Sequence, residues 1–173
     1  MKTRTLTLDD LESVFSMCLE AKETLARRGV DQWQSGFPNR ESLTDDLKSG
    51  RCFAFVTEDD ELAAFTRLNF EPEEPYEHLL SGKWLTGADG YATTHRTVVS
   101  PRFRSTGLSD RLLEEAARRA KDAGCQSIRV DTHRDNRAMR ALIARQGFTE
   151  CCTFLLPNPD DTSPERIGYE KLL

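Results

Sequence analysis

The fold and the chemistry of this chain are decided by the stretch from residue 98 to residue 109, which reads VVSPRFRSTGLS. A strand-like run ends there, a turn containing Gly107 follows, and a helix-forming sequence begins near Ser109. Backbone N–H groups at a helix start, together with the positive end of the helix dipole, bind anions such as phosphate. Gly107 allows close backbone approach, and Arg102 and Arg104 add positive charge. The stretch predicts a site for a phosphate-bearing ligand; the alternative is a plain turn whose arginines face solvent.

The sequence after this turn predicts an amphipathic helix from Ser109 to Ala123, the best-specified element of the chain. Acidic residues come early in it, basic residues come late, and Gly124 ends it, as the helix dipole and glycine termination favour. Its apolar residues recur at helical spacing and are Leu108, Leu112, Leu113, Ala116 and Ala120. The elements expected after it are a buried strand at 127–132, a helix capped by Asp135 and ended by Gly147, and closing strands at 148–156 and 166–172.

The sequence before the turn predicts strands and helices in alternation. The expected elements are a strand at 3–7, a helix opened by a capping box of Asp9 and Glu12 and ended by Gly29, a helix from Asn39 to Gly50, and two strands at 52–57 and 62–70. Residues 71–90 are rich in proline and glycine and predict a long connection. The alternation, with a hairpin in the first half, indicates an α/β or α+β fold with a mixed sheet.

Composition limits the partners that the chain can have. The chain has 173 residues, which suits one domain over 1–173, and its formal net charge is −5. That charge opposes binding to the phosphates of nucleic acid or to an anionic membrane, and no apolar run has transmembrane length. A cytoplasmic protein with reduced thiols is expected, because the N-terminus shows no signal-peptide pattern and the five cysteines lack CxxC and metal-ligand spacing.

The turn also resembles a known motif. The residues that carry the resemblance are Val98, Val99, Pro101, Arg104, Gly107 and Ser109, followed by Leu112 and Leu113. They are similar to the acetyl-CoA-binding motif of the GCN5-related N-acetyltransferase (GNAT) family, in which Arg or Gln is followed by two residues, Gly, one residue, and Gly or Ala. The departure is Ser109, which stands where the family has Gly or Ala and is small enough to be tolerated.

A second segment at the right separation strengthens the resemblance. Asn136, Leu142, Gly147 and Phe148 match the spacing of the family's next segment, from an Asn to a Gly-Phe pair. The resemblance implies the GNAT fold, an α/β (α+β) arrangement in which a mixed, mostly antiparallel seven-stranded sheet is flanked by helices and splayed after its fourth strand. It also implies that acetyl-CoA is the acyl donor, without a metal. The donor-binding residues that it implies are Val98, Val99, Arg104, Ser105, Thr106, Gly107, Leu108, Ser109 and Asn136.

The activity that the resemblance implies is transfer of an acetyl group to a primary amine of a small molecule or peptide, by direct attack in a ternary complex. The family's usual acid is a Tyr seven residues after the motif Asn, and here that position is Ile143. Isoleucine cannot donate a proton, so another group protonates the thiolate or the thiolate leaves unaided. The alternative is a catalytically silent CoA-binding protein that acts as a sensor or scaffold.

Two histidines are candidates for the base that takes the proton of the amine. His95 lies on the strand expected to border the cleft, and His133 follows the end of the strand at 127–132. Histidine titrates near neutral pH, which suits this role, but either side chain is equally a hydrogen-bonded structural residue. A further alternative is a metal site formed by His95 and His133 with Asp131 and Asp135. Carboxylates at a helix start, however, need no metal.

The acceptor pocket is predicted from the region after the first helix, which commonly borders the substrate in the family. Its candidate residues are Trp33, Gln34 and Phe37, whose alternative role is ordinary packing under a loop. The long connection carries four acidic residues, Glu71, Glu73, Glu74 and Glu77. They either attract a cationic amine or form a solvated acidic loop. The exposed ends of the sheet permit a homodimer. An unrelated nucleotide-binding fold finds little support, because the chain has no GxxxxGK[ST] and no GxGxxG after a strand.

Overall fold

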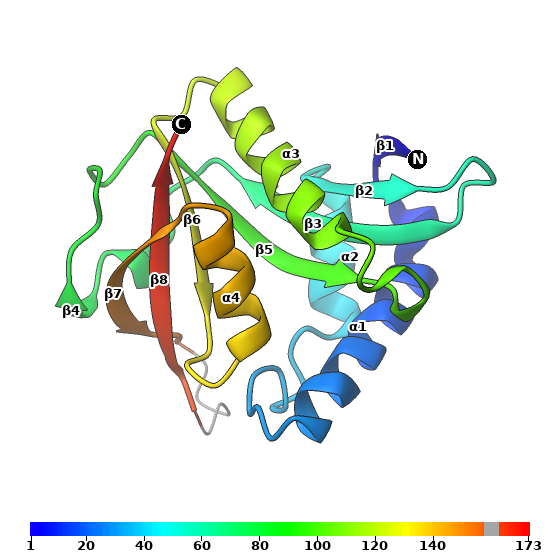
Figure 1. Cartoon of the computed structure of the whole chain (residues 1–173), viewed down its shortest axis with the longest axis horizontal. Helices are drawn as coiled ribbons and strands as arrows, with labels where there is room; N and C mark the ends of the chain where they lie inside the picture. The colour runs from blue at the N-terminus through cyan, green and yellow to red at the C-terminus, as the bar shows by residue number, and fades with distance from the viewer. Residues whose placement is uncertain (158–162) are drawn as a thin grey trace.

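The computed structural model describes residues 1–157 and 163–173, whose strands form a single sheet with helices on both faces (Figure 1). The strands are β1 (Lys2–Thr5), β2 (Cys52–Val56), β3 (Leu62–Asn69), β4 (Leu79–Gly82), β5 (Tyr91–Val99), β6 (Ser127–Thr132), β7 (Thr149–Leu155) and β8 (Glu165–Leu172). The α-helices are α1 (Leu11–Arg27), α2 (Arg40–Lys48), α3 (Leu108–Asp122) and α4 (Arg137–Arg145). Apart from β4, their order agrees with the sequence prediction, and their ends differ from it by at most two residues.

The sheet has the strand order β1-β2-β3-β5-β6-β8-β7-β4. Neighbouring strands are antiparallel except for β5 and β6, which are parallel. That parallel pairing covers only Tyr91–Thr93 of β5 and Ser127–Arg129 of β6, after which the two strands diverge. The mixed sheet and its opening after the fourth strand in sheet order are therefore confirmed.

The strand number differs from the prediction of seven. The eighth strand, β4, lies inside the connection at 71–90 and pairs with β7 at the edge of the sheet. Its sequence, LLSG, is only four residues long and mostly exposed, so it lacks the alternation that would identify a strand.

Two helix starts also differ from the prediction. The capping box at the first helix joins Thr7 and Asp10 instead of Asp9 and Glu12, and it opens a 3-10 turn that leads into α1. At α4 the cap is Asn136, whose side chain accepts a hydrogen bond from Met139 N, and not Asp135. In each case two polar neighbours satisfy the same sequence pattern, and the backbone geometry selects one of them.

Alternate side chains of the central strands pack against helices on opposite faces. Phe53 and Phe55 of β2 belong to the core that includes α3 and α4, whereas Ala54 and Val56 belong to the core with α1 and α2. Figure 1 shows α3 lying across one face of β3 and β5, with α1 and α2 on the other side. Because both faces are covered, β2 is buried along its whole length.

Candidate active site

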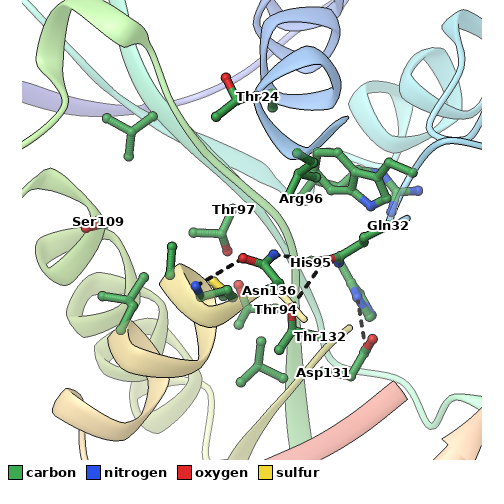
Figure 2. Close-up of a pocket in the computed structure, with 18 of the residues that line it drawn as sticks. Thr24, Gln32, Thr94, His95, Arg96, Thr97, Ser109, Asp131, Thr132 and Asn136 are labelled. Atoms are coloured by element: carbon green, nitrogen blue, oxygen red, sulfur yellow. Dashed lines mark hydrogen bonds and ion pairs between the residues drawn. The ribbon is translucent and has the colours of Figure 1, made fainter. Parts of the chain in front are cut away.

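A cavity of about 1070 Å³ opens where β5 and β6 diverge (Figure 2). Its walls are the second half of β5, the first turns of α3 and α4, the end of β6 and the connection between α1 and α2. These segments are distant in the sequence, and the divergence of the two strands makes the space between them. The cavity has a different chemical character at each end.

One end of the cavity is formed by the turn before α3. Gly107 stands at the N-cap of α3 with φ +80°, a left-handed conformation that glycine adopts without the strain of a side chain. A Cβ placed there would meet no atom within 4 Å, so the space in front of the turn is open. Arg104 lines the same end, and its guanidinium donates a hydrogen bond to Thr24 Oγ1 at 3.3 Å. The helix start, the glycine and the arginine thus lie together where the sequence predicts an anion site.

Most of the predicted donor-side residues face this cavity. Those that line it are Val99, Arg104, Ser105, Gly107, Leu108, Ser109 and Asn136. The side chain of Val98 is instead buried in the core with α1 and α2, and Thr106 Oγ1 donates a hydrogen bond to Phe103 O. These two residues can therefore contribute only their backbones to a ligand in the cavity.

A β-bulge shapes the middle of the cavity. On β3, Phe65 pairs with Val98 and Arg67 pairs with His95, so one residue of β3 lies opposite Arg96 and Thr97 together. Arg96 adopts φ +55°, as the extra residue of a bulge can. The consequence is that His95, Arg96 and Thr97 line the cavity consecutively instead of alternating between the two faces of the sheet.

The residue of β3 opposite the bulge holds it in place. Thr66 is fully buried, and its Oγ1 donates a hydrogen bond to His95 O at 2.8 Å. The same oxygen lies 2.8 Å from Thr94 Oγ1 and 3.1 Å from Thr97 Oγ1. One threonine therefore holds the backbone carbonyl of His95 and the side chains of Thr94 and Thr97.

The other end of the cavity is acidic and is organised around His95. The Nε2 atom of His95 lies 2.8 Å from Glu73 Oε2, and its Nδ1 atom lies 3.8 Å from Asp131 Oδ1. Tyr76 donates a hydrogen bond from its hydroxyl to Asp131 at 2.8 Å, and Thr93 donates one to Glu73 at 2.6 Å. Figure 2 shows the His95 side chain directed toward Asp131.

Burial and charge act in opposite directions on this pair. Burial by itself would lower the pKa of His95, but the hydrogen bonds and negative charge of Glu73 outweigh it and raise that pKa. Burial would likewise raise the pKa of Glu73, but hydrogen bonds from His95, Thr93 and Asn69 hold it at about 2. Glu73 is therefore a carboxylate whose charge favours the protonated form of His95. Of the four acidic residues considered in the connection, Glu73 is the one that reaches the cavity.

Comparison with known proteins agrees with this geometry. The sequence profile of the Acetyltransferase (GNAT) family matches residues 12–148 of the chain. An N-acetyltransferase of Bacillus subtilis named YesJ, described as uncharacterized, is 30% identical over 145 residues, which are 81% of this chain and 77% of that protein.

The chain belongs to the GNAT acetyltransferase family.

Solved structures show the same fold. A GNAT-family acetyltransferase from Streptococcus agalactiae is 28% identical and superposes with a TM-score of 0.87, covering 99% of this chain and 95% of that one. A PaiA N-acetyltransferase from Thermoplasma acidophilum, solved in complex with coenzyme A, is 20% identical with a TM-score of 0.69, covering 99% and 98%. GNAT enzymes bind acetyl-CoA and acetylate amine acceptors. In the described part of the chain no helix is long and apolar enough to cross a membrane.

The usual acid position of the GNAT family carries no proton donor here. Ile143 is fully buried in the core with α3, where it packs as an ordinary apolar residue of α4. The second histidine lies away from the cavity walls. His133 is 3% exposed, its Nε2 lies 2.7 Å from Ser163 Oγ, and its Nδ1 accepts a hydrogen bond from Asp135 N. Both of its ring nitrogens are thus engaged within the protein.

Two of the three predicted acceptor residues line the cavity. Trp33 and Phe37 do so, whereas Gln34 donates hydrogen bonds to the backbone carbonyl groups of Lys22 in α1 and of Gln32. The neighbouring Gln32 lies in the cavity instead. Figure 2 shows its side chain reaching toward Asn136 and Thr132, and its Oε1 accepts hydrogen bonds from Asn136 at 2.8 Å and Thr132 at 3.2 Å. No local signal distinguishes Gln32 from Gln34, because its partners are about a hundred residues away.

Proposed function

We propose that this GNAT enzyme transfers an acetyl group from acetyl-CoA to a primary amine of a small molecule or peptide, by direct attack in a ternary complex. The observation that carries the proposal is a single cavity that joins the anion site before α3 to the acidic cluster around His95. A donor held at one end and an amine held at the other would meet along β5. Placing both reactants in one site is the main requirement of direct transfer.

The donor end supplies binding and orientation. The backbone N–H groups at the start of α3, with Arg104 beside them, suit the diphosphate of acetyl-CoA. The backbones of Val98 and Val99 would then bond the pantetheine arm. Backbone N–H groups near the bulge would stabilise the negative charge that develops on the thioester oxygen, which is commonly the largest contribution in acyl transfer.

The acceptor end supplies the base. In the neutral form of His95, an N–H at Nε2 donates to Glu73 and leaves the lone pair of Nδ1 available. The ammonium group of the acceptor gives one proton to Nδ1, the neutral amine attacks the thioester carbon, the C–S bond breaks, and the nitrogen releases its second proton to solvent. The thiolate then takes a proton from solvent, because Ile143 offers none. His133 has no role in this scheme.

Two glycine variants of the same helix test the donor site. Gly107 and Gly124 flank α3, both have left-handed φ values, and a Cβ at either would meet no atom within 4 Å. Gly107→Glu and Gly124→Glu should each cost about 1–2 kcal/mol from backbone strain. Only Gly107→Glu places a carboxylate in the anion site, so it alone should abolish CoA binding in calorimetry and thiol release with an amine panel. Equal CoA affinity in the two variants contradicts the assignment.

Ile143 favours a second candidate, a CoA-binding protein without transfer activity. The same amine panel separates the two functions. Thiol release that depends on any amine excludes the silent protein. Tight CoA binding without release for every amine in the panel supports it.

A further inference from the structure

A buried carboxylate holds two arginines against the acceptor part of the cavity. Asp46 of α2 is 8% exposed; its Oδ1 lies 3.1 Å from Arg67 Nε and its Oδ2 lies 2.7 Å from Arg96 Nε. Arg67 and Arg96 both line the cavity, and their side chains are 22% and 13% exposed. Arg96 also lies over the ring of Phe37, 4.7 Å from its centroid. Arg67 and Arg96 are called the arginine pair below, and Asp46 is the carboxylate that they share.

The arginine pair has unused hydrogen-bonding capacity. Asp46 faces the Nε atom of each guanidinium, which leaves the two Nη nitrogens of each arginine. Within residues 1–157 and 163–173, neither guanidinium has a hydrogen-bond acceptor in good geometry. The two guanidinium groups share the single carboxylate of Asp46. The arginine pair and Asp46 together therefore have a net charge of +1 beside the cavity. Planar guanidinium groups with free donors suit a carboxylate.

The charge of the arginine pair is matched by the opposite charge of the His95 cluster. Glu73 and Asp131 are two carboxylates around His95, so this cluster is negative whether the imidazole is neutral or protonated. The two groups are close, because Arg67 is the cross-strand partner of His95 and Arg96 follows His95 in the chain. Cross-strand partners have Cβ atoms about 4.5–5.5 Å apart. An amine and an anion that bind both groups at once can therefore belong to one small molecule.

We infer that the acceptor is a free amino acid or a close analogue, whose carboxylate binds the Nη nitrogens of Arg67 and Arg96 while its amine lies beside His95. The inference rests on the proposed function and names the substrate class of the same site. Simple alkylamines and the N-termini of peptides lack a carboxylate next to the amine, so they are expected to be poor acceptors.

The substrate comparison uses free amino acids, the amide of each, and the alkylamine that lacks the carboxyl group, with thiol release as the readout. The amino group of an amino acid amide is less basic than that of the free acid, so a larger fraction of it is neutral. If the enzyme did not recognise the carboxylate, the amides should therefore react faster than the free acids. A lower KM for the free acid than for its amide, by about 10- to 100-fold, is the expected result. Amides or alkylamines that match the free acids overturn the inference and leave the proposed function intact.

Two matched variants assign the effect to the arginine pair. Arg96→Gln and Arg67→Gln should each raise KM for the amino acid by about 10-fold or more and reduce the preference for acid over amide, while the affinity for CoA stays unchanged. Arg96→Lys retains the charge without the planar donors and should fall between wild type and Arg96→Gln. A preference that survives both glutamine variants contradicts the inference.

Calorimetry keeps the inference testable if transfer fails. Amino acids are titrated into the protein–CoA complex, with their amides as controls. Binding of acids but not amides, lost in Arg96→Gln, supports recognition of the amino acid carboxylate by the arginine pair even if no amine is acetylated and the proposed function is wrong. Absence of both binding and transfer overturns the two together.

Discussion

The carboxylate of Glu170 is the most deeply buried charge of the fold, and its replacement by glutamine is expected to destabilise the protein by about 3–5 kcal/mol. Glu170 is fully buried and its partner Arg129 is 1% exposed, with Nε and Oε1 3.0 Å apart. The same carboxylate accepts a hydrogen bond from Ser127 Oγ at 2.5 Å and one from Leu85 N at 2.5 Å. The pair joins β6, β8 and the connection before β5, at the place where β5 and β6 are still paired.

The magnitude follows from what Glu170→Gln leaves behind. Arg129 would keep its charge in the interior, sandwiched between the rings of Trp84 and Tyr91 at 4.3 and 3.7 Å from their centroids. Glutamine retains the size of the side chain, so the loss is mainly that of the compensating charge. For a chain of this length about 1 kcal/mol changes Tm by about 2–4 °C, so a decrease of about 6–20 °C is expected.

The effect should depend on pH. Burial alone would raise the pKa of Glu170, but hydrogen bonds from Ser127, Thr86 and Arg129 outweigh it and lower the pKa. A carboxyl group whose pKa is lower in the folded state stabilises the protein above its unfolded pKa, and this contribution is lost as the pH falls through the folded value. The difference in unfolding free energy between wild type and Glu170→Gln should therefore shrink in acid.

The assay is urea unfolding followed by circular dichroism at several pH values. Asp122→Asn is the control, because it breaks an exposed pair with Arg118 and should cause no measurable change. In an Arg129→Met background Glu170→Gln should cost much less, since no buried charge is left without a partner. A loss equal to that of the control, or one that grows in acid, refutes the reasoning.

Three further predictions concern the site. Glu73→Gln removes the charge that raises the pKa of His95, so the acid limb of the kcat profile should move to lower pH, whatever the basicity of the acceptor. His95→Gln should lower kcat by about 10²–10⁴-fold, whereas His133→Gln should lower Tm and leave kcat unchanged; the reverse pattern would make His133 the base. Gln32→Ala breaks the link to Asn136 and should raise the acceptor KM by about fivefold and speed amide exchange across residues 30–38.

The residues at the α3 end of the cavity could be singled out from the sequence because their signals are local. An anion site at a helix start needs a strand end, a turn with a glycine in the left-handed conformation, and an amphipathic helix, and all three lie between residues 91 and 123. Gly107 has the φ value that its role requires. The second motif is equally local, since Asn136 caps α4 within three residues.

The acceptor end is less predictable because its parts meet only in three dimensions. Asp46 lies on a short amphipathic helix where a carboxylate is normally solvated, and nothing in that helix indicates two arginines from β3 and β5. Glu73 is one of four similar acids in its connection, and it is distinguished only by the strand that passes beside it. Contacts between segments far apart in the sequence leave no periodic pattern in either segment.

The bulge in β5 explains how one strand serves both ends of the site. In a regular strand, residues an odd number of positions apart face opposite sides, so Ala92 and Val99 would point away from each other. Both nevertheless pack against the core that contains α3 and α4. The extra residue at Arg96 reverses the alternation once, so that the part of β5 paired with β6 and the part beside the donor turn present the same face. The left-handed conformation at Arg96 thus directs His95, Arg96 and Val99 into one cavity.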